Sequence, residues 1–134
     1  VWYDDTDDPS KWGTDQEIFY MKYNKTTGWS NATAISGTGL NGWNNDISNS
    51  ASIGISGEGI ISVVFYDTTD GAWGTDGEIM YMKYTPNPGW SNATVISDSK
   101  YLNEGDSKSP AIAVGPDGTI HAVWEDFSNI SGCL

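Results

Sequence analysis

The sequence contains no arginine and only six lysines, against eighteen aspartate and glutamate residues, so its formal net charge is −12. Proteins bind nucleic acids through clustered positive charge, which this chain does not have. No apolar run approaches the roughly 20 residues that a membrane-spanning helix needs. We therefore expect neither a nucleic-acid partner nor membrane insertion.

Cysteine and helix-forming patterns are also scarce. Cys133 is the only cysteine, so the chain has neither a disulfide framework nor a Cys-x-x-Cys metal pair. No window carries Ala, Leu, Glu and Lys at helical spacing, whereas the turn-forming residues Asp, Gly, Asn, Ser and Thr are abundant. Seven tryptophans and seven tyrosines supply much of the apolar content. These features predict an all-β protein.

An internal repeat organises the chain. Residues 12–36 align with residues 73–97 without a gap, and 18 of the 25 positions are identical. A shorter motif occurs three times, as "VWYD" at 1–4, "VFYD" at 64–67 and "VWED" at 123–126. Such self-similarity, at a period of about 60 residues, indicates repeated structural units.

The second copy of the repeat is the most complete. Its predicted strands are 51–55, 60–67, 78–84 and 90–97. Short connections join these strands, which predicts an antiparallel meander. The turn "PDG" predicts one more hairpin within 109–126. The chain is thus divided into four parts. These are a partial unit of three strands at 1–36, a complete unit of four strands at 50–97, a partial unit of two strands at 109–127 and a tail at 128–134.

The predicted strand 78–84 carries apolar side chains on both faces, with Ile79 and Tyr81 on one and Met80 and Met82 on the other. A sheet with one face in water would keep a polar face, so both faces of this strand must be covered. Four-stranded sheets that repeat at a fixed period and are covered on both faces describe β-propeller blades. A β-sandwich is the alternative, but it does not explain the period.

The stretch "PAIAVGPDGTIHAVWED" (110–126), together with "GEIMYMKY" and "GWS" of the second copy, resembles the sialidase-like β-propellers, also called BNR or Asp-box repeat proteins. The resemblance implies four-stranded blades with an S-x-D-x-G-x-x-W box in the turn between the third and fourth strands. The corresponding turns, "YNKTTGWS" and "YTPNPGWS", keep the Gly and Trp but lack the Ser and Asp. The resemblance is therefore specific for fold and only weakly specific for function.

Sialidase activity is not expected from these residues. Sialidases resemble one another in holding the substrate carboxylate with three arginines, and this chain has none. Another glycosidase would need two carboxylates about 5–10 Å apart. Acidic residues recur at equivalent strand ends, which favours a structural role in turns. These residues are Asp4, Asp67, Glu125, Asp126, Glu17 and Glu78.

The repeated "WGTD" loops hold the candidate ligand-binding residues, Trp12 with Asp15 and Trp73 with Asp76. Sugars stack on exposed aromatic faces, while carboxylates accept hydrogen bonds from sugar hydroxyls. Packing inside the loop is the alternative for the two tryptophans.

Two further tryptophans, Trp29 and Trp90, begin the predicted fourth strands. At that place in the repeat we expect them to pack between neighbouring units.

The acidic loops 4–10 and 67–71 are candidates for binding Ca²⁺, which prefers oxygen ligands. A solvated turn is the alternative, because the spacing is not that of an EF-hand. The candidate ligands are Asp4, Asp7, Asp67 and Asp70.

Four Asn-X-Ser/Thr sequons are candidate glycosylation sites, at Asn24, Asn31, Asn92 and Asn129. We expect an extracellular or cell-surface location.

We expect a non-catalytic β-propeller module that binds glycans or proteins through its loops, with Ca²⁺ as the one cofactor considered. Two alternatives stay open: a self-assembling structural or filament protein, and part of a glycoside hydrolase whose catalytic residues lie elsewhere. Two units cannot close a ring, so we expect either a longer propeller or completion by further copies of the chain.

Overall fold

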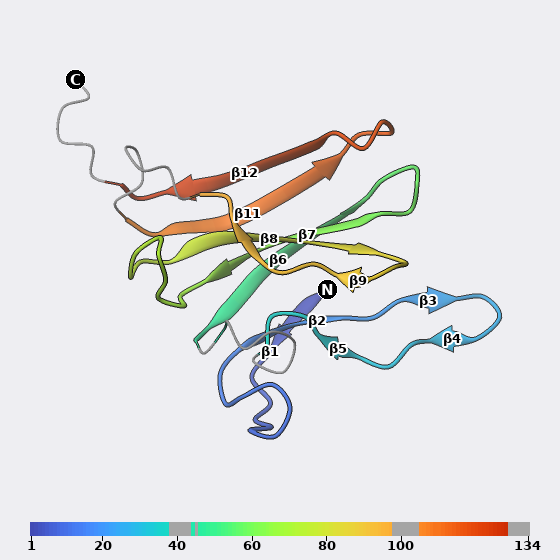
Figure 1. Cartoon of the computed structure of the whole chain (residues 1–134), viewed down its shortest axis with the longest axis horizontal. Coiled ribbons are helices and arrows are strands. Elements are labelled where there is room, and N and C mark those ends of the chain that lie inside the picture. The colour runs from blue at the N-terminus through green and yellow to red at the C-terminus, as the bar shows by residue number, and fades with distance from the viewer. Residues whose placement is uncertain (38–43, 45, 98–104, 129–134) are drawn as a thin grey trace.

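The computed structural model describes residues 1–37, 44, 46–97 and 105–128, which form strands, turns and loops (Figure 1). None of these residues forms a helix that could cross a membrane. The predicted all-β class is confirmed. The strands are β1 (Trp2–Asp4), β2 (Glu17–Tyr20), β3 (Tyr23–Asn24), β4 (Gly28–Trp29), β5 (Thr33–Ala34), β6 (Ser48–Ile55), β7 (Ile61–Asp67), β8 (Glu78–Thr85), β9 (Gly89–Trp90), β10 (Thr94–Val95), β11 (Ser107–Val114) and β12 (Ile120–Asp126).

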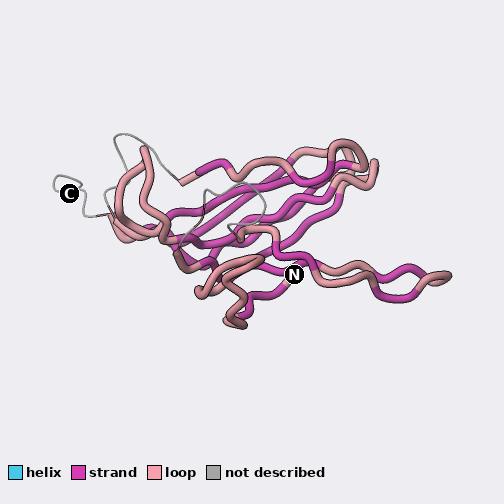
Figure 2. Tube along the Cα trace, turned by 60° about the horizontal axis from the view of Figure 1, so that its bottom comes forward, coloured by secondary structure: helices cyan, strands magenta, loops and turns pink. Residues whose placement is uncertain are grey.

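The central sheet has the order β10–β8–β7–β6, and β9 pairs with the far end of β8. The pairings β6–β7 and β7–β8 are antiparallel between consecutive strands, and β10 also pairs antiparallel with β8, as the predicted meander requires. Figure 1 shows the β11–β12 pair on one side of this sheet and the smaller sheet β1–β2–β5 on the other. A separate hairpin, β3–β4, extends away from the rest of the molecule in Figures 1 and 2.

The prediction of one fourth strand over 90–97 was wrong, because the structure has two short strands, β9 and β10. Serine hydroxyls accept hydrogen bonds from β8 both within the break and beyond β10. The Lys83 N–H donates to Ser91 Oγ at 3.1 Å, and the Ile79 N–H donates to Ser97 Oγ at 2.8 Å. A serine side chain that accepts from a neighbouring strand competes with the regular backbone ladder.

The core lies on β7 and β8. Three consecutive side chains of β7, Val63, Val64 and Phe65, have no exposed surface, so this strand is covered on both faces. The same holds for β8, where Ile79 and Met80 point to opposite faces and are both buried. The predicted two-sided covering is therefore confirmed.

The hairpins β6–β7 and β11–β12 share one irregularity. The register shifts between Asn49 and Ser52 in the first hairpin and between Lys108 and Ala111 in the second. At the corresponding serines, Ser50 and Ser109, φ is 53° and 54°. A positive φ is uncommon outside glycine, so the same β-bulge at equivalent positions shows that the two hairpins repeat the same local structure.

Candidate functional site

The "WGTD" loops are held by glycine. Gly13 and Gly74 have φ of 111° and 130°, and a Cβ on either would lie 2.6 Å from the Oδ1 of Asp15 or Asp76. Only glycine fits such a position without strain. The two aspartates thus fold back over their own loops, and each has an Oδ2 that is buried with no hydrogen-bond partner in the described protein.

The two tryptophans of these loops are anchored in the same way by their indole nitrogens. Trp12 Nε1 donates to the Thr6 carbonyl at 2.7 Å, and Trp73 Nε1 donates to the Thr69 carbonyl at 3.0 Å. The Trp73 ring lies directly on Gly71, where a Cβ would meet it at 2.4 Å. Trp73 also packs against the hydrophobic core, so its role is packing.

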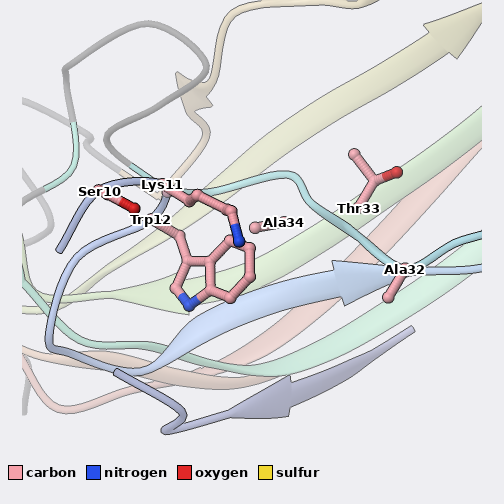
Figure 3. Close-up of a pocket in the computed structure, with 7 residues that line it drawn as sticks. Ser10, Lys11, Trp12, Ala32, Thr33 and Ala34 are labelled. Carbon is pink, nitrogen blue, oxygen red and sulfur yellow. The ribbon is translucent and has the colours of Figure 1, made fainter. Parts of the chain in front are cut away.

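The Trp12 ring has different surroundings, because Ser10 takes the place of Gly71 in the first copy. The Trp12 and Phe19 rings form a T-shaped pair, with centroids 5.5 Å apart. The Lys11 ammonium lies 5.1 Å from its centroid and pairs with Asp8 at 2.9 Å. The ring lines an open groove of about 400 Å³ (Figure 3). The other residues of this groove, which we call the Trp12 groove, are Ser10, Lys11, Ala32, Thr33, Ala34 and Gly37.

The Trp12 groove combines an aromatic ring, an ammonium group and the hydroxyls of Ser10 and Thr33. Figure 3 shows Lys11 extending over the ring, at one end of the groove. A few polar groups around an aromatic surface are typical of small-ligand sites. Of the four sequence candidates, Trp12 alone lines this groove.

The strand-end aspartates form turns. Asp4, Asp67 and Asp126 each accept a hydrogen bond from the backbone N–H two residues further on, at 2.9, 2.8 and 2.8 Å. This is the local bond by which aspartate favours a turn. The structural interpretation of these residues therefore has direct support.

Between the first and second copies lies a buried polar network, formed by Glu17, Ser36, Asn44, Ser48 and Asp67. One part is the bond from the serine at 36 to the glutamate, 2.5 Å long. In the other part, the serine at 48 donates to the aspartate at 2.6 Å and accepts from the asparagine amide at 2.6 Å. Sequence reasoning missed the serines and the asparagine, although the serine at 36 is identical in the second copy.

Burial dominates the electrostatics of this network. It raises the pKa of Glu17 from 4.5 to about 8, against the hydrogen bond from Ser36, and the charges of Asp15 and Asp67 raise it further. Burial likewise raises the pKa of Asp67. Neither Glu17 nor Asp67 has exposed surface, so this pair of carboxyls presents nothing to a sugar in the structure.

The four calcium candidates have different environments. Asp7 and Asp70 are exposed, Asp4 is half-buried and Asp67 is buried. Within the described part of the chain, no three His, Cys, Asp or Glu side chains are grouped as metal ligands. The predicted set is therefore not brought together, and calcium binding stays a prediction from the sequence.

Three of the four sequon asparagines, Asn24, Asn31 and Asn92, are exposed. The fourth, Asn129, lies outside the described residues, as does Cys133.

The tryptophans that begin the fourth strands differ sharply. Trp90 meets Tyr20 of the first copy edge-on, with centroids 5.2 Å apart, and packs on Tyr84 at 5.5 Å. The prediction that it packs between units is confirmed. Trp29 is 66% exposed and its ring meets Tyr23 of its own hairpin, so within the described chain it does not show the predicted packing between units.

Comparisons with known protein families, with curated proteins and with solved structures gave no match. The likeness to sialidase-like propellers thus remains an expectation from the sequence, and function has to be inferred from the geometry of the chain itself.

Proposed function

We propose that this chain is a non-catalytic, extracellular or cell-surface module of sialidase-like β-propeller type that binds glycans through its loops. The Trp12 groove is the binding site. One observation carries the proposal: Trp12 lines an open groove, whereas its equivalent, Trp73, lies on Gly71.

The chemistry of the groove favours a sugar. The C–H face of a pyranose stacks on an indole ring, and the ammonium of Lys11 and the hydroxyls of Ser10 and Thr33 supply hydrogen bonds to its hydroxyls. Strand β5 carries Thr33 and Ala34, so one wall of the site belongs to the sheet and the other to the loop.

The blade interpretation has support from the repeat and from the central meander. That sheet is covered on both faces, with buried side chains along β7 and β8. Two alternatives are that the chain binds a protein surface, or that it is part of an enzyme whose catalytic residues lie elsewhere in a longer protein. For either alternative we expect no sugar to bind in the Trp12 groove.

A self-assembling structural protein is the second candidate. It is favoured by the large apolar side chains exposed at both ends of the molecule, with Trp29 66% and Val123 67% exposed. Apolar patches of this kind mark interaction surfaces.

The test is titration calorimetry with a panel of neutral and acidic oligosaccharides. We expect Trp12→Ala to weaken glycan binding at least tenfold, because the stacking surface is lost. Trp73→Ala is the matched control, since it removes the equivalent residue that packs on the core; it should lower stability and leave the affinity of the folded protein unchanged. Absence of binding by the whole panel, or equal affinities of wild type and Trp12→Ala, would contradict the proposal.

A further inference from the structure

One aromatic contact inside the chain shows how neighbouring copies of the repeat meet. Trp90, at the start of the fourth strand of the second copy, stacks edge-on against Tyr20, in the third strand of the first copy. The repeat places Trp29 at the position of Trp90 and Tyr81 at the position of Tyr20. Trp29, on β4, and Tyr81, on β8, therefore stand at the positions of the two partners of this contact.

The Trp29 end is open. This ring is 66% exposed on the β3–β4 hairpin, which extends away from the body of the molecule in both views (Figures 1 and 2). Together with Val1, Trp2 and Met21 it lines a mainly apolar groove of about 360 Å³.

The Tyr81 end is also open. Tyr81 lies in a groove of about 180 Å³ between the central sheet and the β11–β12 hairpin, and Ile120 lines the opposite wall. A cavity of about 150 Å³ admits a benzene ring, so this groove has room for an aromatic side chain. We call it the Tyr81 groove; its remaining lining residues are Ser56, Glu58, Ile60, Ser62, Lys83, Val114 and Gly118.

Strand β12 offers a backbone edge beside the Tyr81 groove. Its equivalent in the second copy, β7, pairs with β6 on one side and β8 on the other. In the described chain β12 pairs with β11 alone. Val123 of β12 is 67% exposed, whereas the equivalent Val64 of β7 has no exposed surface. The edge of β7 that β8 occupies in the second copy has no partner strand on β12 in the described chain, and the face of β7 that β11 covers is exposed on β12.

Charge favours the same pairing of ends. Residues 18–45 contain Lys22 and Lys25 and no aspartate or glutamate, in a chain whose net charge is −12. The Tyr81 groove carries one residue of each sign, Glu58 and Lys83, and both are exposed. The positively charged hairpin with Trp29 therefore meets no net repulsion from this groove and is attracted by the acidic net charge of a second copy.

We propose that two copies of this chain associate head to tail, with Trp29 of one copy in the Tyr81 groove of the next. Strand β2 of the incoming copy then pairs with the free edge of β12, as β8 pairs with β7 inside the chain. Strands β1 and β12 occupy the same place in the repeat, so β1, which has 3 residues against 7 in β12, is displaced. This contact uses neither Trp12 nor its groove.

The first experiment is sedimentation equilibrium of the full chain over a range of protein concentrations, at an ionic strength that screens the acidic surfaces. We expect the wild type to form multiples of the 14.5 kDa chain. Trp29→Ala and Ile120→Glu should each weaken association at least tenfold, because a buried tryptophan is a frequent hot spot and a buried carboxylate is costly. Both residues are exposed in the single chain, so both variants should fold.

Ile47→Ala is the matched control. It removes another exposed apolar side chain, at the opposite end of β6 from the Tyr81 groove, and should leave association unchanged. A monomer at all concentrations would overturn the proposal, and so would association that neither Trp29→Ala nor Ile120→Glu weakens.

Cross-linking locates the contact. In a Cys133→Ser background, Thr26→Cys chains mixed with Lys83→Cys chains should link through a short bismaleimide more efficiently than either variant alone, because both residues are exposed beside the proposed contact and leave Trp29 and Tyr81 in place. Lys22→Cys with Asn87→Cys in one chain, at the equivalent positions of the repeat, supplies the internal benchmark. Equal linking in the mixed and the separate samples would place the interface elsewhere and overturn the proposal.

Discussion

The first copy of the repeat, residues 12–36, and the second copy, residues 73–97, are identical at 18 of 25 positions, yet they do not have the same structure. In the second copy, β8 runs unbroken for 8 residues and pairs with β7, β9 and β10. In the first copy the same stretch is divided into β2, with 4 residues, and β3, with 2. The β3–β4 hairpin forms a sheet of its own.

The difference lies in what surrounds each copy. The second copy has the first copy on one face and the β11–β12 hairpin on the other. The first copy has a neighbour on one face only within the described chain. Burial of apolar surface stabilises a strand more than its intrinsic propensity does. In the described chain, this strand of the repeat is thus long where neighbouring units cover both faces of the sheet and short where one face has no neighbour.

The largest effect on the free energy of unfolding is expected at the two equivalent tryptophans, Trp90 and Trp29, which differ in exposure. Trp90→Ala removes a half-buried ring that contacts Tyr20 and Tyr84, and should lower the free energy of unfolding by about 2–3 kcal/mol, somewhat less than a fully buried aromatic. Trp29→Ala should change it by less than about 0.5 kcal/mol in the monomer. Urea unfolding followed by circular dichroism measures both. Equal losses would mean that Trp29 is covered in solution by its own chain.

A second pair sharpens the same comparison between the second and third copies. Val64→Ala leaves a cavity in a fully buried site and should cost about 2 kcal/mol, whereas Val123→Ala, at a site 67% exposed, should cost less than about 0.5 kcal/mol. The two valines are equivalent in the repeat, so side-chain chemistry is held constant. A loss of about 2 kcal/mol in the free energy of unfolding for Val123→Ala would show that the face of β12 with Val123 is covered.

The third prediction concerns pH. The pKa of Glu17 is raised from 4.5 to about 8 in the fold, so the folded state keeps a proton that the unfolded state releases. Stability should therefore fall as pH rises from about 4.5 to about 8. Glu17→Gln should remove this loss, and near pH 8 the variant should be more stable than wild type by about 1–3 kcal/mol.

Thermal melts across this pH range check the prediction. Glu58→Gln, at an exposed position, is the control and should follow the wild-type pH profile. A parallel profile for Glu17→Gln would contradict the assigned pKa shift.

Much of the fold could be predicted from the sequence because its signals are local. The alternating and β-branched runs gave the long strands, and "PDG" gave the hairpin in which Gly118 adopts a φ of 84°. The fourth strand was misjudged, since its apolar pattern does not reveal that Ser91 and Ser97 take over hydrogen bonds from the backbone.

The candidate site was only partly predictable. The "WGTD" motif drew attention to Trp12 and Trp73 alike, and the replacement of Gly71 by Ser10 was visible in the sequence. The sequence does not show that the Trp12 ring lines a groove while the Trp73 ring packs on Gly71, because this depends on how each ring lies against its loop. The buried network around Glu17 joins residues far apart in the chain, so no local sequence pattern predicts it.

The sequence by itself determined the all-β class, the period of the repeat and the turns, because hydrophobic alternation, glycine and aspartate act within a few residues. Only the tertiary structure decided which equivalent residues are covered. Val64 and Val123, like Trp90 and Trp29, occupy the same positions in the repeat and differ in exposure. Exposure depends on neighbours brought together from distant parts of the chain, and a short repeated motif does not specify those neighbours.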